Sequence, residues 1–134
     1  MDDNITRLRP AGLVSSPAFS HVAVVPPGAT TIYVGGQNSV GADGALIGAD
    51  DVATQAARTL ENVKTALAAV DATIDDIVQW NVLFVDGVDL SAAYGAIASQ
   101  LASEEPALVT GARVAALGVP GALVEISAIA AVFR

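Results

Sequence analysis

Two stretches of the chain place apolar residues at every third or fourth position, which is the period of an amphipathic helix. The first runs from about residue 52 to residue 70, and it follows Asp50 and Asp51, either of which can cap its first turn. The second runs from about residue 90 to residue 102, with Asp89 as its capping residue. We expect the polar side of the first helix to face solvent. That side carries Gln55, Arg58, Asn62 and Thr65.

Shorter runs of β-branched and apolar residues predict strands around these helices. Residues 77–85 alternate between apolar and more polar positions and predict one strand. The runs 21–25 and 31–35 are joined by a turn rich in proline and glycine, which predicts a hairpin. Residues 45–47 are a candidate for a brief further strand. The first 20 residues contain several helix and strand breakers and predict an irregular lead-in.

The end of the chain contains two apolar runs, 107–117 and 122–133, joined by a Gly/Pro turn. This pattern predicts a β-hairpin. Both runs are apolar on both sides, so we expect strands that are buried on both faces. A symmetric turn would place their two charged residues, Arg113 and Glu125, opposite each other. Because an isolated buried charge is costly, we expect an ion pair, which is either structural or part of a ligand site.

The order of these elements predicts an α+β domain over residues 1–134, in which a single mixed β-sheet carries both helices on one face. The alternation of the last two strands makes the other face apolar as well. Hydrophobic residues make up 53% of the chain, and a monomer of this size has too much surface to bury all of them. We therefore expect the uncovered face to meet other subunits in a closed oligomer.

Charge and composition narrow the possible partners and cofactors. Fourteen acidic and six basic residues give a net charge of −8 without a basic cluster, which argues against a nucleic-acid partner. With no cysteine, one histidine and no ligand spacing, neither a metal nor another cofactor is expected. Arg113, Pro120 and Glu125 argue against a membrane span in the apolar C-terminal run. The polar N-terminus does not resemble a signal peptide, so we expect a cytoplasmic location.

Several blocks of the sequence follow one another in the order found in a known family. They lie at residues 5–8, 17–20, 32–37, 55–64, 85–86 and 121–130. In these blocks, and nearly from end to end, the chain resembles the RidA/YjgF-like proteins, also labelled endoribonuclease L-PSP. The resemblance implies a RidA/chorismate-mutase-like fold assembled as a homotrimer, with three ligand clefts between subunits.

The resemblance also implies a chemistry. The best-known branch of the family hydrolyses reactive imines and enamines of the 2-iminobutanoate and 2-iminopropanoate type to 2-keto acids and ammonia. This reaction requires a guanidinium that holds the substrate carboxylate and a carboxylate that positions water. The family's arginine lies in a Pro-Ala-Arg-Ser motif, where this chain has Leu108 or, in an alignment shifted by one residue, Val109. The water-positioning carboxylate is kept as Glu125.

Other positions of the implied site differ from the family too. The family's cysteine is replaced by Thr110 or Gly111, and its serine by Gly35. An aromatic hydroxyl becomes Phe19, and an asparagine becomes Tyr94. The resemblance therefore implies ligand-binding residues Phe19, Tyr33, Gly35, Gln37, Tyr94, Leu108, Val109 and Thr110, with Glu125 and Arg113 as the candidate catalytic residues.

We therefore predict a RidA-like trimer that binds a small metabolite in its intersubunit clefts and that is not a standard 2-iminoalkanoate deaminase. Three hypotheses stay open. In the first, a free Glu125 positions water for hydrolysis of an imine or enamine, and Arg113 is displaced into the role of the missing arginine. In the second, the two residues are salt-bridged and the pocket binds passively. In the third, side chains fill the cleft and the trimer is structural.

Overall fold

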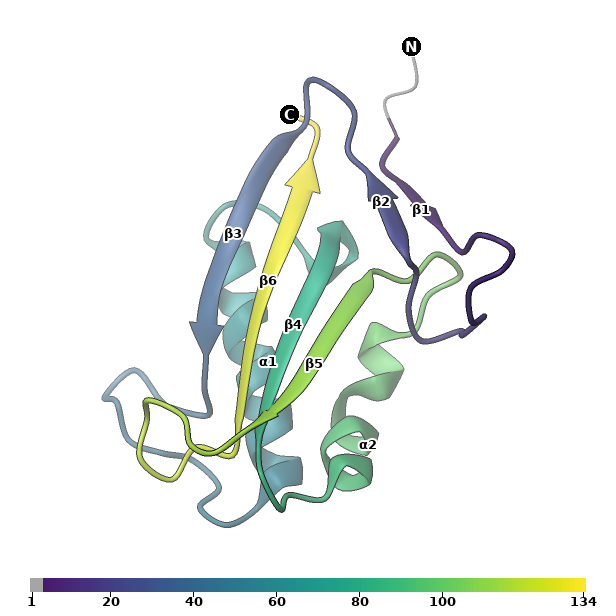
Figure 1. The fold of residues 1–134 in the computed structure, drawn as a ribbon. Coiled ribbons are helices and arrows are strands. Elements are labelled where there is room, and N and C mark those ends of the chain that lie inside the picture. The colour runs from purple at the N-terminus through teal and green to yellow at the C-terminus, as the bar shows by residue number, and fades with distance from the viewer. Residues whose placement is uncertain (1–3) are drawn as a thin grey trace.

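The computed structural model describes residues 4–134 as a four-stranded sheet with two helices on one face and a separate two-stranded ribbon (Figure 1). The two-layer arrangement confirms the prediction of two helices on one face of a mixed sheet, but β1 and β2 form a second sheet, so the prediction of a single sheet is wrong. The strands of the main sheet are β3 (Thr30–Gln37), β4 (Ile77–Val85), β5 (Leu108–Val114) and β6 (Val124–Val132). The helices are α1 (Val52–Ala68), the short 3-10 helix η1 (Ile74–Asp76) and α2 (Leu90–Leu101).

The strand order is β3-β6-β4-β5, with β4 and β5 parallel and the other pairs antiparallel. The predicted C-terminal hairpin is therefore wrong, because β4 lies between β5 and β6. Helix α2 connects β4 to β5, and a helical crossover of this kind joins parallel neighbours. Strand β6 then pairs with the remaining edge of β4. Its core-facing residues are apolar, whereas its other face carries Glu125 and Ser127 beside Ile129, so the predicted burial of this strand between two apolar faces is wrong within one chain.

The predicted N-terminal hairpin is also wrong. Strand β2 (Val22–Val24) pairs with β1 (Thr6–Leu8), which lies in the segment expected to be irregular, whereas β3 pairs with β6. Of that predicted lead-in, residues 1–3 lie outside the described residues. Residues 45–47 do not form the candidate strand; the structure has one isolated β-bridge there, between Val40 and Leu46.

Both helices begin where their caps predict. The Asp51 carboxylate accepts a hydrogen bond from the backbone N–H of Thr54 (3.1 Å), and the Asp89 carboxylate accepts one from Ala92 (3.2 Å). Helix α1 ends at Ala68 rather than Val70, and α2 ends one residue before the predicted limit. None of the helices within residues 4–134 is long and apolar enough to span a membrane.

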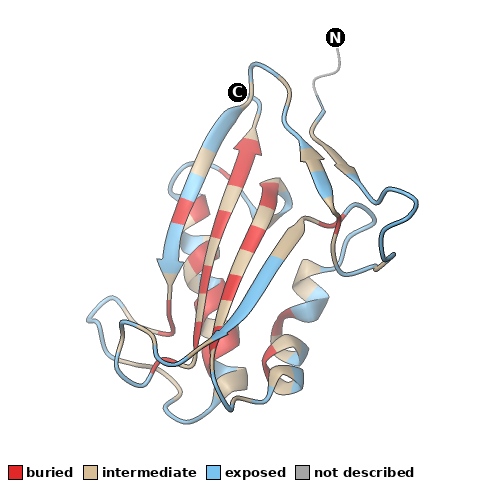
Figure 2. Cartoon of the chain, in the orientation of Figure 1, coloured by how far each residue is buried: buried red, intermediate tan, exposed pale blue. Residues whose placement is uncertain are grey.

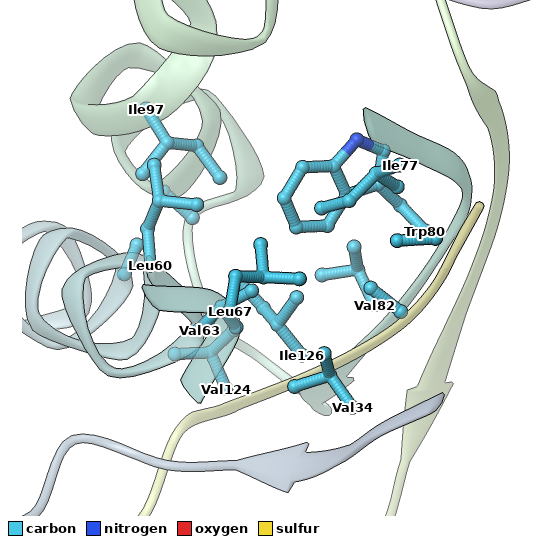
Figure 3. Close-up of a cluster of buried hydrophobic side chains, with 14 of the residues drawn as sticks. Val34, Leu60, Val63, Leu67, Ile77, Trp80, Val82, Ile97, Val124 and Ile126 are labelled. Atoms are coloured by element: carbon cyan, nitrogen blue, oxygen red, sulfur yellow. The ribbon is translucent and has the colours of Figure 1, made fainter. Parts of the chain in front are cut away.

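The core lies between the helices and the sheet. Buried residues alternate with half-buried ones along most of β4 and β6, while the helices contribute one stripe each (Figure 2). In Figure 3 the α1 side chains Leu60, Val63 and Leu67 lie against the strand residues. The sheet contributes Val34, Trp80, Val82, Phe84, Val124 and Ile126, and α2 contributes Ala93 and Ile97. This packing confirms the helical and strand periods that the sequence indicates.

The opposite face of the sheet is mixed rather than uniformly apolar. It carries Leu83 and Ile129, but also Gln79, Asn81 and Ser127, all of which are half-buried. Residues 110–113 of β5 are exposed, so the expectation that this strand is buried on both sides is wrong within one chain. Strand β5 is an edge strand of the sheet, so its side chains have a neighbouring strand along one edge only.

Candidate functional site

Glu125 stands on the uncovered face of the sheet, as the second residue of strand β6. It pairs in register with Leu83 of β4, and the strand residues on either side of it, Val124 and Ile126, point into the core. Its carboxylate makes no hydrogen bond or ion pair with any residue from 4 to 134, where Lys64 and Glu61 form the one salt bridge. Glu125 is therefore free to accept hydrogen bonds from water or a ligand.

Gly36 lies directly against this carboxylate. The pairing of β3 with β6 shifts between Val34 and Gln37, which forms a bulge at the two glycines. A Cβ placed on Gly36 would lie 2.8 Å from Cδ and 2.9 Å from Oε2 of Glu125, so no larger residue fits without displacing the carboxylate. Gly35 has open space at the same point. The side chain of Gln37 folds back onto the bulge and donates to the carbonyl of Gly35 (3.3 Å).

Side-chain amides of a buried and a half-buried asparagine fix the backbone on both sides of this contact. Asn38, just after β3, donates from its side chain to the carbonyl of Val124 (3.0 Å), the residue before Glu125. The side-chain amide of Asn62 on α1 donates to the carbonyls of Asn38 (2.8 Å) and Val40 (2.9 Å). Helix α1 thus holds the end of β3 against the start of β6.

Gln55 ties the same helix to the loop that precedes β6. Its side-chain NH₂ donates to the carbonyls of Gly48 (3.1 Å) and Gly121 (3.2 Å), and its side-chain oxygen accepts from the N–H of Leu123 (2.8 Å). Gln55 is completely buried, so the prediction that the polar side of this helix is solvated is wrong at this position. A buried amide is tolerated here because both of its polar atoms have partners.

A row of uncharged polar side chains crosses the sheet beside Glu125. Asn81 of β4 pairs with Ser127 of β6 on one side and with Thr110 of β5 on the other. The side chains of Asn81, Ser127 and Thr110 make no hydrogen bond to a described residue. Sequence reasoning missed Asn81 and Ser127, although the alternation around Trp80 already places Asn81 opposite the core.

The predicted site residues divide between two faces of the sheet. Leu108 and Thr110 share the face of Glu125, because they pair with Gln79 and Asn81. Tyr33 also lies there, since it pairs with Ile129, and it is 77% exposed. Val109 pairs with Trp80 and faces the helices. An arginine at position 108 would therefore stand on the face of Glu125, and one at position 109 would not.

Two other predicted site residues lie away from Glu125 within the chain. Tyr94 of α2 makes an edge-to-face contact with Phe84 on the helix side of the sheet, at 5.4 Å between ring centres. Burial raises the pKa of the Tyr94 phenol above its ordinary value. Phe19 lies in the connection between β1 and β2, where its ring contacts His21 at 5.4 Å.

Arg113 and Glu125 do not form the predicted ion pair. Arg113 pairs in register with Phe84, whereas Glu125 pairs with Leu83, so the two side chains leave opposite faces of the sheet with β4 between them. The Arg113 guanidinium instead lies near the carbonyl of Val88 (3.4 Å). The prediction fails because the two strands that carry these residues are not neighbours.

The carboxylates of the described chain do not form a metal centre. Within residues 4–134 no three or more His, Asp or Glu side chains are placed to hold a metal ion. Asp71, Asp75 and Glu105 line an open hollow of about 690 Å³ beside β1, together with Arg7 and other residues. This hollow does not include Glu125 or the polar row beside it.

Comparisons with known proteins identify the family to which this fold belongs. The family model described as Endoribonuclease L-PSP matches residues 11–132. Among solved structures, a Rid-family protein of unknown function from Yersinia pestis, YyfB, is 29% identical with a TM-score of 0.83, over 96% of this chain and 99% of that one. RidA from an Antarctic Psychrobacter species is 26% identical with a TM-score of 0.68, over 94% of each chain.

A member of the YjgF/YER057c/UK114 family from Mycobacterium tuberculosis is 25% identical with a TM-score of 0.64, over 96% of this chain and 100% of that one. No curated protein matches the chain. The matched family model spans most of the described strands and both helices, including β6 with Glu125. The chain therefore belongs to the endoribonuclease L-PSP family, the group of Rid and YjgF proteins.

Proposed function

We propose that this protein is a homotrimer that binds a small metabolite without a carboxylate at the Glu125 face and hydrolyses a carbon–nitrogen double bond in it. The observation that carries the proposal is the carboxylate of Glu125, which lies against Gly36 on the uncovered face and has no hydrogen-bond or ion-pair partner among residues 4–134. A carboxylate that was only structural would be expected to have a cation or a donor beside it.

The chemistry follows from the groups around this carboxylate. Glu125 accepts a hydrogen bond from water and thereby directs the water oxygen towards the imine carbon, a role that typically contributes about 10²–10⁴-fold to the rate. The tight contact with Gly36 limits the positions that the carboxylate can take. Asn81, Ser127 and Thr110 offer donors and acceptors to the rest of the ligand.

Leu108 argues against the 2-imino acids as substrates. It places an apolar side chain where a guanidinium would otherwise hold the substrate carboxylate on this face. Each charge-assisted hydrogen bond lost in this way removes about 1.5–3 kcal/mol of binding. The alternative deaminase with a displaced Arg113 is less well supported, because the Arg113 side chain lies on the other face of the sheet.

The exposed apolar surface supports the trimer. Tyr33 lies on the uncovered sheet face, and Leu8, Val22 and Val24 lie on the ribbon of β1 and β2, each at least 39% exposed. An aromatic side chain exposed on a sheet face is typical of a protein interface. An interface across the uncovered face would enclose Glu125, which in one chain stands on an open sheet.

Light scattering tests the trimer, and ammonia release tests the reaction. The substrate is an imine generated in situ from a primary amine, compared with freshly generated 2-iminopropanoate. We expect faster ammonia release from the carboxylate-free imine, lost in Glu125→Gln and retained in Glu104→Gln, a control in which the changed carboxylate is exposed and makes no described contact. A rate equal to that of buffer for both imines would contradict the hydrolytic function.

A further inference from the structure

We propose, as an extension of the proposed function, that the ligand of the Glu125 site carries a positive charge on nitrogen and no anionic group. The substrates of this class are iminium ions derived from primary amines. Glu125 then has two roles, because the carboxylate that orients the water also compensates the charge of the group that the water attacks.

The placement of the chain's basic side chains supports this ligand class. All six Lys and Arg residues are described, and none stands on the uncovered face of the sheet. Arg113 leaves β5 on the helix side, and Lys64 and Arg58 belong to α1, which covers that same helix side. Arg7 donates to the carbonyls of Asp75 and Ile77, Arg9 to those of Ser16 and Glu104, and Arg134 to that of Val70.

Among residues 4–134 of one chain, the site therefore has one fixed charge, and it is negative. The side chains of Asn81, Ser127 and Thr110 beside it are uncharged. The excess of acidic residues, with a net charge of −8, adds a field of the same sign. An anionic ligand would meet repulsion here without a compensating cation from the described residues. A cationic ligand gains an ion pair with a carboxylate that has no partner within residues 4–134.

The reaction is balanced with water as the only other reactant. The water oxygen attacks the carbon of R₂C=NH₂⁺, the carbon–nitrogen bond breaks, and the products are R₂C=O and NH₄⁺. Glu125 holds the water during the attack, and the protons released by the water end on the departing nitrogen. The reaction that supplies such a substrate is the two-electron oxidation of a primary amine that lacks a carboxylate.

Three probes of nearly equal shape test the sign of the charge: benzamidinium, benzamide and benzoate. Their binding is followed by NMR through the backbone amides of Asn81 and Ser127. We expect benzamidinium to bind roughly tenfold or more tightly than benzamide, and benzoate not to bind at this face. In Glu125→Gln the preference for benzamidinium over benzamide should disappear.

The variant Asp75→Asn is the control for binding elsewhere on the protein, because it alters the acidic hollow beside β1. In this variant benzamidinium should cause the same chemical-shift changes at Asn81 and Ser127 as in the wild type. Equal or tighter binding of benzoate would overturn the inference. So would benzamidinium binding that survives Glu125→Gln, or no benzamidinium binding at millimolar concentration. Charge-selective binding without imine hydrolysis would support the cationic ligand class and contradict the proposed reaction. Imine hydrolysis without charge-selective binding would support the proposed reaction and contradict the cationic ligand class.

Discussion

Gly36 and the carboxylate of Glu125 are in such close contact that a single added carbon on Gly36 would lie 2.8 Å from Glu125 Cδ. The glycine belongs to the bulge at the end of β3 and the glutamate to the neighbouring strand β6. The absence of a side chain at position 36 therefore leaves the space that the carboxylate occupies. This contact relates the double glycine to the one charged group of the candidate site.

Replacing this glycine should affect function more than stability. In Gly36→Ala the nearest atoms belong to the end of the flexible Glu125 side chain, so we expect the carboxylate to move while the fold remains. A misplacement of about 1 Å can cost on the order of 100-fold in rate. Ammonia release and chemical denaturation measure the two effects. Gly35→Ala, which has open space at its Cβ, is the control, and an equal loss in both variants would contradict this account.

A guanidinium introduced on the face of Glu125 should allow the site to bind a carboxylate. Leu108→Arg places a cation on that face, whereas Val109→Arg places one on the helix side. With one charge-assisted bond worth about 1.5–3 kcal/mol, we expect Leu108→Arg to strengthen benzoate binding about 10- to 100-fold. Leu108→Gln controls for polarity without charge. Calorimetric titration that found the larger gain for a folded Val109→Arg would contradict the assigned faces.

Arg113 and Glu125 should contribute independently to stability. They leave opposite faces of the sheet and do not share a partner, so the effects of Arg113→Ala and Glu125→Ala should add within about 0.5 kcal/mol. Chemical denaturation of the wild type, both single variants and the double variant, at one protein concentration, gives the coupling energy. A coupling of several kcal/mol would indicate that the two charges meet in the assembled protein.

Loss of the Gln55 side-chain amide should destabilise the fold. Gln55→Leu leaves the Leu123 N–H and the Gly48 and Gly121 carbonyls without this partner. Each buried group left unpaired costs about 1–3 kcal/mol, so the variant should lose roughly 3 kcal/mol or more of its unfolding free energy. Thr65→Ala, on an exposed side of the same helix, should change it by less than about 0.5 kcal/mol. Similar denaturation midpoints for the two variants would count against the role of Gln55.

The cap of α1 should weaken in acid. The backbone N–H and the hydroxyl of Thr54 donate to Asp51 and lower the pKa of its carboxyl. A lowered folded-state pKa gives stability that is present above about pH 4 and lost as the pH falls through that folded-state value. The difference in melting temperature between wild type and Asp51→Ala should thus be constant from pH 5 to pH 8 and shrink below about pH 4. A difference that is as large at pH 3 as at pH 7 would contradict this.

The sequence by itself determined the elements that depend on local patterns. Strand β4 spans the predicted residues, and both helices begin at their predicted aspartates, because side-chain period and capping act over only a few residues. The choice of Glu125 as the candidate catalytic carboxylate could be inferred from the resemblance to the family. The importance of the adjacent glycines could only be suspected, since a bulge and a ligand approach leave the same pattern.

Tertiary structure decided which strands are neighbours, and the site depends on that choice. Two apolar runs and a turn fit a hairpin locally, yet α2 makes β4 and β5 parallel partners and separates β5 from β6. Because alternate residues of a strand face opposite sides, this pairing places Arg113 away from Glu125 and aligns Asn81 with Ser127 and Thr110. Pairing between distant segments is a non-local property, and no local period in the sequence specifies it.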